Sequence, residues 1–569
     1  MFLSSPSTGR RTRGSGLLLI LALLVSLPSA SLVAARAQDG GDKILRIQQG
    51  IYPETIDPQV GSALAEISIW TLNYEGLTRL DENLQTAPAA AESWEFNADA
   101  TAITFTLREG LTYSDGTPLT AERFRYAIER TCDPNVAGGY QYLLTDVIAG
   151  CAEFASLFDT EAATPVAPDD TAAYEAARAN IGVSAPDDLT LEIEFIQPAP
   201  YFPTIASLWV FYPAQQELIE AGGEDWWQDP ANHLGNGPFQ VTELEPDQLV
   251  SFELNENYWG GTPLVDGIEY VYILDSTAAL EAYRNGDVDM MGVDPAQIPL
   301  IEEDPELSEQ LLRYGAANTW YLNFNLNEEP FQDLKVREAF AYAFDRETYC
   351  AEIVNGTCVP VLSWVPQDVF GSIETDAFAF DPEAAQAALA ESSYGSADEL
   401  PEIHYFYNSD DPLNQARVEW IAGQYRDILG IELILEPTPG TTLSGLRTPE
   451  TYPQFSIYNW YQDYPDPQNW LSIYWSCASR FAERVGYCNA EFDELVGQAD
   501  RETDPEVRAP LYEQASQILI EDLPGPPIFS FANIFLVSPA VSGYAPTSID
   551  GGWPGERVSA LTVDVNRDE

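Results

Sequence analysis

The sequence predicts a mixed α/β protein built from more than one domain. Alternating apolar runs, which are typical of strands, take turns along the chain with apolar residues at helical spacing. The chain has 569 residues, more than a single hydrophobic core normally organises. Its hydrophobic fraction of 45%, with 13 Trp, 29 Tyr and 25 Phe, is enough for large packed cores.

The N-terminal residues predict export. Arg10, Arg11 and Arg13 precede an apolar run over residues 17–27, and small residues follow up to Ala37. This is the pattern of a secretory signal peptide, and we expect residues 1–37 to be removed. The apolar run is shorter than the roughly 20 residues that a membrane anchor needs. The first cysteine is Cys132, so no lipid-anchoring cysteine is expected, and the predicted location is extracytoplasmic.

The first half of the mature chain begins as an α/β lobe and then changes texture. Alternation predicts strands, and apolar residues three and four positions apart predict helices. The stretch 160–188 is rich in Ala, Asp, Pro and Thr, which is typical of a surface insertion. The expected strands are 43–47, 103–107 and 189–195, and the expected helices are 63–72 and one that follows Thr120.

The second half repeats the alternation of strand and helix, and a second lobe is expected to begin near Tyr314. Gly286 is expected to end a helix that contains Leu280 and Tyr283. The run 528–536 is expected to return the chain to the first lobe. Further strands are expected at 268–273, 288–290, 320–326, 403–407 and 431–435, and further helices around 336–343, 418–428 and 507–518.

The charge of the chain excludes one class of partner. Without residues 1–37 the chain keeps 22 basic and 90 acidic side chains, a net charge of −68. Such a charge repels nucleic acid and anionic lipid and eases the approach of cationic solutes. An acidic surface suited to salty surroundings explains the bulk charge better than ligand binding does.

The six cysteines fall into three pairs that are close in sequence. In an oxidising compartment we expect three short-loop disulfides, although the sequence alone leaves fifteen pairings open. The alternative of a metal site lacks C-x-x-C spacing and neighbouring histidines. The pairs are Cys132 with Cys151, Cys350 with Cys358, and Cys477 with Cys488.

Signatures of catalysis are missing from the sequence. His233 and His404 are the only histidines, which leaves little for a histidine-ligated metal or a histidine general base. No H-E-x-x-H, G-x-S-x-G or P-loop motif occurs. Chance carboxylate pairs are unavoidable among 90 acids, so they carry no weight. We expect no enzyme activity and no cofactor.

One segment has the composition of a cation-binding site. Residues 459–467 read Asn-Trp-Tyr-Gln-Asp-Tyr-Pro-Asp-Pro, with aromatic side chains around Asp463. Aromatic faces attract a cation, and a carboxylate in a water-poor cleft forms a charge-assisted hydrogen bond with it. For an isolated motif, a structural role for Trp460 and Tyr464 in the core is the stronger interpretation.

An ordered series of short motifs changes that balance. With these motifs the chain resembles the family 5 extracytoplasmic solute-binding proteins, and within them the oligopeptide- and dipeptide-binding members. The motifs are Thr55-Ile56-Asp57-Pro58, Glu75-Gly76-Leu77, Ala91-Glu92-Ser93-Trp94, Leu107-Arg108-Glu109-Gly110, Ser114-Asp115-Gly116-Thr117-Pro118, Gly235-Asn236-Gly237-Pro238-Phe239, Asn257-Tyr258-Trp259, Arg284-Asn285-Gly286-Asp287-Val288-Asp289 and Leu334-Lys335-Val336-Arg337-Glu338-Ala339.

The resemblance implies a two-lobed periplasmic-binding-protein clamshell, class II type, with an additional third domain. It implies a monomer that binds a short peptide by strand addition and works with ABC transporter permease subunits in the membrane. The implied division is domain I from residues 38–82, 205–312 and 528–569, domain II from 83–204, and domain III from 313–527.

The resemblance also assigns roles to single residues. Asp463 matches the aspartate that pairs with the α-amino group of the ligand, with Trp460 and Tyr461 on its strand. Tyr321 and Asn323 match a second ligand-facing edge, and Tyr140 matches a domain II contact. The domain I lip is represented by Ser62, Ala63 and Leu64. Some family members have an arginine six residues before the aspartate for the peptide carboxylate, where this chain has Ile457.

The sequence therefore predicts an exported solute-binding protein for short peptides. Three alternatives stay open. The same fold could hold another solute, such as an oligosaccharide, an opine or a nickel complex. A secreted hydrolase with a carboxylate pair and a structural surface protein are alternatives from other classes.

Overall fold

A computed structural model describes residues 43–159, 166–550 and 559–567 of the chain. The predicted signal peptide, residues 1–37, lies outside the described residues. Within them, no helix is both long and apolar enough to cross a membrane.

The largest element is a 12-stranded sheet with strand order β16-β15-β17-β13-β18-β11-β1-β10-β9-β8. Two more strands, β12 and β14, pair with β18 outside this path. The strands are β1 (Ile44–Gln49), β8 (Phe239–Glu245), β9 (Leu249–Leu254), β10 (Gly267–Tyr272), β11 (Met290–Gly292), β12 (Leu311–Gly315), β13 (Asn318–Phe324), β14 (Cys358–Pro360), β15 (Ile403–Asn408), β16 (Leu433–Thr438), β17 (Phe455–Tyr461) and β18 (Pro527–Val537).

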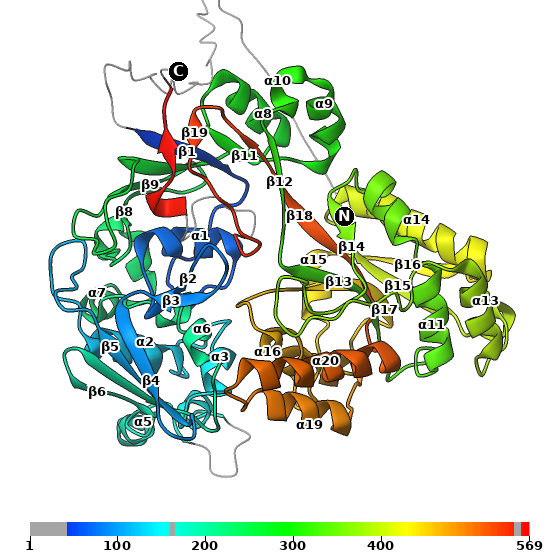
Figure 1. The fold of residues 1–569 in the computed structure, drawn as a ribbon, viewed down its shortest axis with the longest axis horizontal. Helices are drawn as coiled ribbons and strands as arrows, with labels where there is room; N and C mark the ends of the chain where they lie inside the picture. Colours follow the sequence, from blue (N-terminus) through cyan, green and yellow to red (C-terminus); the bar gives the residue numbers. More distant parts are fainter. Residues whose placement is uncertain (1–42, 160–165, 551–558, 568–569) are drawn as a thin grey trace, which may run out of the picture. The chain divides into compact units, whose positions relative to one another are not determined.

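One long strand joins the two halves of this sheet. The first part of β18 pairs with β13 and β14, and its later part pairs with β12 and β11. Figure 1 shows β18 running between the group that holds β1 and the group that holds β17. The expected strand at 528–536 is confirmed, and it belongs to both groups.

The group around β13 and β17 has a helical layer and a separate core on each face (Figure 1). Leu322 and Phe324 of β13 pack with α11, α13 and α14, whereas Tyr321 points to the other face and packs with α16, α17, α19 and α20. This is the side-chain alternation of a strand. The helices are α11 (Leu334–Ala343), α13 (Pro382–Glu391), α14 (Pro412–Leu429), α16 (Pro467–Trp470), α17 (Ser472–Trp475), α18 (Arg480–Val485), α19 (Ala490–Ala499) and α20 (Pro505–Asp522), with the short α12 (Arg346–Thr348) and α15 (Gly440–Gly445) between them.

Aspartates begin many of these helices. The carboxylate of Asp411 accepts a hydrogen bond from the Leu413 amide at the start of α14, and Asp504 does the same at the start of α20. Gly430 ends α14 with a φ of 74°, a value that suits glycine. Part of the acidic composition therefore serves as helix caps.

The group around β1 carries α1 (Leu64–Asn73) and a cluster of short helices. Ile69 and Leu72 of α1 pack against strands β8, β9 and β10. The expected helix at 63–72 and the expected strand at 43–47 are confirmed. The helices that follow β10 are α8 (Ser276–Asn285), α9 (Ile298–Glu303) and α10 (Pro305–Ser308), and Gly286 ends α8 as predicted.

A second, four-stranded sheet has the order β4-β5-β7-β6. Its core includes Phe105, Phe124 and Leu191 and continues to Trp70 of α1. The helices and strands of this part of the chain, from residue 78 to residue 222, are β2 (Thr78–Leu80), β3 (Thr86–Pro88), β4 (Ala91–Phe96), β5 (Ala102–Leu107), α2 (Ala121–Thr131), α3 (Tyr142–Thr145), α4 (Cys151–Ala155), α5 (Thr171–Arg178), β6 (Val183–Asp187), β7 (Thr190–Glu194), α6 (Phe202–Ile205) and α7 (Gln216–Gly222).

The stretch 160–188 contains more regular structure than the sequence predicted. Residues 160–165 lie outside the described residues, but α5 and β6 follow. The Asp170 side chain accepts a hydrogen bond from the Ala173 amide and so begins α5, which has no buried residue. Residues 166–180 lie on the surface as expected, and the stretch also supplies the edge strand β6.

The three disulfides join the cysteines that are close in sequence. They are Cys132–Cys151, Cys350–Cys358 and Cys477–Cys488. Each closes a short loop on a framework of strands and helices.

Candidate ligand-binding site

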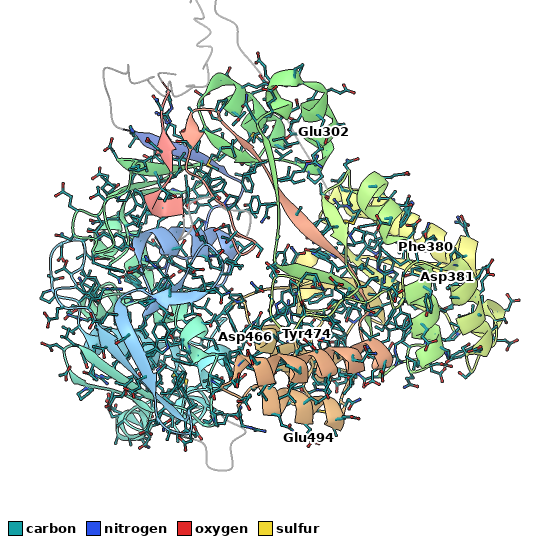
Figure 2. The ribbon with its side chains drawn as sticks, in the orientation of Figure 1. Glu302, Phe380, Asp381, Asp466, Tyr474 and Glu494 are labelled. Carbon is teal, nitrogen blue, oxygen red and sulfur yellow. A yellow bond between two sulfur atoms is a disulfide. The ribbon has the colours of Figure 1, made fainter. Side chains whose placement is uncertain are left out.

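Asp463 lies just beyond the end of β17, at the start of a turn that a buried ion pair stabilises. Three residues later, Asp466 accepts two hydrogen bonds from the Arg508 guanidinium of α20, at 2.6 and 2.8 Å. Both partners are buried, so this bidentate pair fixes the Pro465-Asp466-Pro467 turn. Figure 2 labels Asp466 close to α16. The ion pair thereby positions Asp463 relative to the strand.

The Asp463 carboxylate receives hydrogen bonds from three side chains. The Tyr140 hydroxyl donates to Oδ1 at 2.8 Å, and the Tyr142 hydroxyl donates to Oδ2 at 3.1 Å. The Asn469 amide also donates to Oδ2, at 2.9 Å. Burial raises the pKa of both tyrosines well above their usual value, so their hydroxyls stay protonated and act as donors.

The electrostatic balance at Asp463 is unfavourable to its charge. Burial raises the pKa of this carboxyl, while the hydrogen bonds from Asn469, Tyr140 and Tyr142 and the charge of Arg480 act in the opposite direction. Arg480 lies over the Tyr142 ring, with its Cζ 4.8 Å from the ring centroid. The carboxylate is therefore held by donors that stop short of compensating its desolvation.

The loop that carries Tyr140 and Tyr142, which we call the tyrosine loop, is fixed by close backbone contacts. A side chain at Gly138 would place its Cβ 2.0 Å from the Gln59 carbonyl oxygen, so only glycine fits there. The Gly139 amide donates to the Val60 carbonyl at 3.4 Å. The Cys132–Cys151 disulfide closes the same loop at its base. These contacts set the two tyrosines against the segment before α1.

The segment before α1 is organised by Glu66. Its carboxylate accepts hydrogen bonds from the Ser62 amide at 2.6 Å and the Ala63 amide at 2.8 Å. These bonds satisfy amide groups that a helix start otherwise leaves without partners. They also place Ser62 and Leu64 at the edge of a cavity.

A cavity of about 200 Å³ lies here, and among the described residues that line it Asp463 is the only one with a charged side chain. The other described contributors are apolar, aromatic or neutral polar, and they come from α1 and the segment before it, the tyrosine loop, the turn at Trp209, the end of β17 and Ile549. The lining residues are Ser62, Leu64, Ile67, Tyr140, Trp209, Tyr461, Gln462, Asp463 and Ile549. We call this cavity the acidic cavity.

Five residues that the sequence singled out line the acidic cavity: Asp463, Tyr140, Tyr461, Ser62 and Leu64. Ala63 lies beside them at the start of α1 and is not among the lining residues.

Three other predicted site residues lie on the face of β13 and β17 that packs against α17. The ring of Trp460 packs on Tyr474 and Phe481, with centroids 5.0 Å away in each case. Tyr321 is fully buried, and its hydroxyl bonds to that of Tyr474 at 2.5 Å. The Asn323 amide donates to the Ser456 hydroxyl at 2.9 Å. The structure places these side chains in the core and away from the acidic cavity.

Sequence reasoning missed Tyr142, Asn469 and Trp209. Tyr142 stands two residues after Tyr140 in a Gly-Tyr-Gln-Tyr segment, which was a usable signal. Asn469 follows the prolines of the turn and reaches back to Asp463 from the first turn of α16. No local pattern marks Trp209, which reaches the cavity because its ring packs on Tyr140 at 4.7 Å.

A larger cavity, of about 350 Å³, lies further back along β17. Ile457, Tyr458 and Asn459 of β17 line it together with residues of β13, β15, β18 and α14. Most of its lining is aromatic or aliphatic, and its charged residues are Asp411 and Arg417. We call it the aromatic cavity.

Between the two cavities, one edge of β17 is open. On one side β17 pairs with β13 along its whole length, from Phe455 to Tyr461. On the other side, within the part of the chain that the structure describes, the ladder with β15 is a single pair between Phe455 and Tyr405. The backbone from Ile457 to Tyr461 can therefore accept an added strand.

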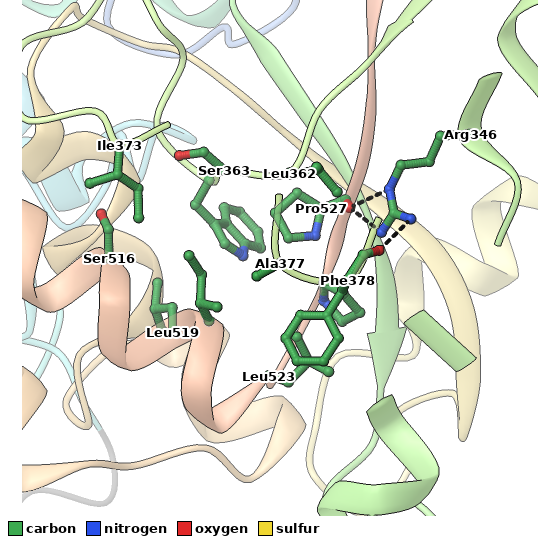
Figure 3. A pocket seen from close by; sticks show the side chains of 13 residues that line it. Arg346, Leu362, Ser363, Ile373, Ala377, Phe378, Ser516, Leu519, Leu523 and Pro527 are labelled. Atoms are coloured by element: carbon green, nitrogen blue, oxygen red, sulfur yellow. Dashed lines mark hydrogen bonds between the residues drawn. The ribbon is translucent and has the colours of Figure 1, made fainter. Parts of the chain in front are cut away.

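The pocket in Figure 3 is a packing gap. Its volume is about 10 Å³, close to the space of one water molecule. The Arg346 guanidinium at its edge donates to the backbone carbonyls of Pro527 and Phe378. Burial lowers the pKa of Arg346 to about 10, and these carbonyls satisfy its donors.

Metal ligands are not gathered anywhere in residues 43–159, 166–550 or 559–567. No group of three or more His, Cys, Asp or Glu side chains there could hold a metal ion. His233 is buried with its ring against Trp226, and its pKa is lowered to about 4 by burial.

The protein thus has an α/β fold with two cavities along one open strand edge. Comparison with known proteins gives the family. The model of the bacterial extracellular solute-binding proteins, family 5 Middle, matches residues 85–481. The chain therefore belongs to the family 5 extracellular solute-binding proteins.

Two curated relatives are similar over nearly their whole length. The dipeptide-binding protein DppE of Bacillus subtilis (strain 168) is 27% identical over 531 residues, which cover 89% of this chain and 90% of that protein. The probable deoxycholate-binding periplasmic protein YgiS of Escherichia coli (strain K12) is 30% identical over 545 residues, with 92% and 95% covered.

A solved structure shows the same fold. The Escherichia coli murein tripeptide binding protein MppA superposes with a TM-score of 0.74 at 23% identity, covering 92% of this chain and 98% of that one. The expected fold, a two-lobed α/β clamshell with an additional domain, is confirmed.

Proposed function

We propose that this protein captures short peptides outside the cytoplasmic membrane and delivers them to an ABC importer. Asp463 anchors the α-amino group of the peptide. The observation that carries the proposal is a cavity at the end of an open strand edge in which Asp463 is the one charged side chain among the described lining residues. The dipeptide-binding and murein tripeptide-binding relatives support a peptide as the solute.

The hydrogen bonds at Asp463 leave room for an ammonium group. A carboxylate has about four acceptor positions, and Tyr140, Tyr142 and Asn469 use three of them. An ammonium in the acidic cavity supplies the missing donor and the opposite charge. A ligand that fills this cavity excludes water from the carboxylate, and the charge-assisted bond is then strong.

The open edge of β17 supplies the rest of the affinity. An extended peptide that adds to the backbone between Ile457 and Tyr461 gains main-chain hydrogen bonds that do not depend on its side chains. The proposed division into domains I, II and III, with the ranges given above, places the Tyr140 loop in domain II and Asp463 in domain III. The hydrogen bonds from Tyr140 and Tyr142 already join these two domains at Asp463, and the ammonium of a bound peptide adds a further partner to this contact.

Replacement of the anchor tests the proposal. Asp463→Asn should weaken the binding of free-amine tetra- to hexapeptides by about 2–5 kcal/mol, because the ammonium loses a desolvated partner. Isothermal titration calorimetry measures this, with a peptide first selected from a random pool by its retention on the wild-type protein.

Two controls make the result specific. Asp289→Asn replaces another buried aspartate, which accepts hydrogen bonds from the Arg46 amide and the Arg567 guanidinium and lines neither cavity, so peptide affinity should not change. N-acetylation of the peptide should weaken its binding to the wild type about as much as Asp463→Asn weakens the binding of the free-amine peptide. It should weaken binding to the Asp463→Asn variant little further. Equal affinity of wild type and Asp463→Asn for the free-amine peptide contradicts the proposal.

The aromatic cavity favours one second candidate, an apolar carboxylic acid. Its lining is rich in aromatic rings and holds one arginine, and the YgiS relative is named as a probable deoxycholate-binding protein. Mass spectrometry of the material that copurifies with the protein separates the two candidates. A binding protein also returns its ligand intact, whereas a hydrolase does not.

A further inference from the structure

We propose that Arg417 binds the carboxylate end of the ligand, inside the aromatic cavity. The inference rests on the proposed function, since it concerns the second end of the same peptide. It assigns a specificity-determining residue on α14, a helix on which sequence analysis singled out no site residue.

The charges of the two cavities are complementary to a zwitterion. Among the described lining residues, Asp463 is the only charged residue of the acidic cavity, and Arg417 is the only basic residue of the aromatic cavity, where the acidic neighbour Asp411 occupies one of its guanidinium nitrogens. The two cavities share one strand, because Tyr461 lines the first and Ile457 and Asn459 line the second. A ligand that follows the open edge of β17 therefore meets an acid at one end and a base at the other.

Arg417 has donors to offer. Its Nη1 atom donates to the Asn414 side-chain oxygen at 2.9 Å and to Asp411 Oδ2 at 3.2 Å. Within the described residues, Nε and Nη2 have no hydrogen-bond partner. The Arg417 side chain is 18% exposed, so a carboxylate that reaches it is shielded from water.

The contacts on Nη1 hold the guanidinium in place. Asp411 is fixed in turn, because its Oδ1 accepts from the Leu413 amide and begins α14. The charge of Arg417 reaches the cavity wall, where it opposes the rise that burial causes in the pKa of Tyr349. The arginine is thus held at the cavity with the edge of its fork available for a bidentate carboxylate.

The spacing along β17 sets the length of the ligand. Ile457 and Asn459 precede Asp463 by six and four residues. At about 3.3 Å per residue this is roughly 13–20 Å, which an extended peptide of about four to six residues spans. Its last side chain would enter a cavity lined by Trp320, Phe529 and Phe531, so an apolar or aromatic C-terminal residue fits best.

The experiment uses one retained peptide in three synthetic forms: free at both ends, amidated at the C-terminus, and acetylated at the N-terminus. For the wild type, we expect amidation to weaken binding by about thirtyfold or more, the low end of the loss when a desolvated charge loses its partner. Arg417→Gln should weaken the free acid by a similar factor and leave the amide unchanged. A ratio of acid to amide affinity that stays the same in Arg417→Gln overturns the inference.

A matched control and a rescue keep the result specific. Arg426→Gln removes a more exposed arginine from the same helix, with a side chain that is 53% exposed, and should leave all three affinities unchanged. Ile457→Arg in the Arg417→Gln background places a cation in the same cavity and should restore the preference for the acid. Failure of the rescue, together with a lower melting temperature of Arg417→Gln, identifies a structural role and overturns the inference.

The acetylated form separates this inference from the proposed function. If acetylation has no effect while amidation does, Asp463 is not the amine anchor, but Arg417 remains the carboxylate anchor. If the retained ligand is an apolar acid without an amine, and only Arg417→Gln weakens it, the peptide proposal fails and Arg417 keeps its role. If Arg417→Gln changes the affinity for no carboxylate, the inference fails even where Asp463→Asn abolishes peptide binding.

Discussion

At the scale of single residues, Asp463 is held in a state that favours a cationic ligand. Burial makes its charge unfavourable, and the three donors and Arg480 offset this only in part. A buried carboxylate whose charge is only partly compensated in the ligand-free protein is strongly stabilised when a cation binds to it. This is the expected pattern of a binding residue, and it predicts a dependence on pH.

Peptide affinity should fall as the pH is lowered through the pKa of Asp463 in the ligand-free protein. That pKa lies above the ordinary value of 3.8 because the carboxyl is buried. The ammonium binds the ionised carboxylate, so protonation of Asp463 competes with the ligand and a proton is released on binding. Calorimetric titrations between about pH 4 and pH 8, in buffers with different ionisation enthalpies, measure both effects.

The Asp463→Asn variant provides the control for the pH series. Its affinity, already reduced, should be flat over the same range, because the group that titrates is gone. A pH profile in Asp463→Asn identical to that of the wild type would assign the dependence to another group.

At the scale of elements, the alternation of strand side chains explains which site residues the sequence could predict. Trp460 and Tyr461 are neighbours on β17, so they must point to opposite faces. In the register of the sheet, Tyr461 lies opposite Asn318 and Trp460 opposite Thr319, which places Trp460 on the face that packs against α17. The pattern of the residues gave no sign of which face lines the cavities.

The order of strands and helices was predictable because it depends on local periodicity. The contributions of Tyr142 and Trp209 were not, because they depend on contacts between segments far apart in the chain. Tyr142 and Asp463 are separated by 321 residues, and only the packing of the tyrosine loop brings them together. Motifs near Asp463 could therefore single out this carboxylate but not Tyr142, which donates to it from a distant segment.

The Cys132–Cys151 disulfide is predicted to matter for binding as well as for stability. It closes the loop that carries Tyr140 and Tyr142, with a sequence separation of 19. Replacement of both cysteines by serine should destabilise the protein by about 3 kcal/mol and weaken peptide binding, because the two donors to Asp463 lose their fixed positions. Chemical denaturation and calorimetry measure the two effects.

The Cys350–Cys358 disulfide is the matched comparison, with a separation of 8 and no donor to Asp463 in its loop. Its removal should destabilise the protein by about 2.5 kcal/mol while leaving unchanged the penalty for N-acetylation of the peptide. Loss of that penalty in both double variants would mean that global loosening, and not the tyrosine loop, controls the amine site.

At the scale of the whole molecule, charge opposes folding while one strand holds the main sheet together. β18 pairs with strands of both groups, so the backbone hydrogen bonds of one segment contribute to two cores. The chain has 90 acidic and 26 basic side chains, and several of the acids are helix caps or partners in buried ion pairs. The remaining acids repel one another on the surface.

This repulsion predicts that the melting temperature rises with ionic strength. Salt shortens the range of the interaction between exposed charges from about 30 Å at 0.01 M to about 3 Å at 1 M, so the mutual repulsion of the surface acids fades. The buried Asp466–Arg508 pair, in which both side chains are less than a tenth exposed, is screened far less and should survive. Calorimetric melting of the mature protein over that range of sodium chloride measures the shift.

The same series in a strongly excluded sugar, which adds no charge, separates screening from the general strengthening of apolar burial. A melting temperature that is constant in salt, or that rises equally in sugar alone, would show that surface charge does not limit the stability of this fold.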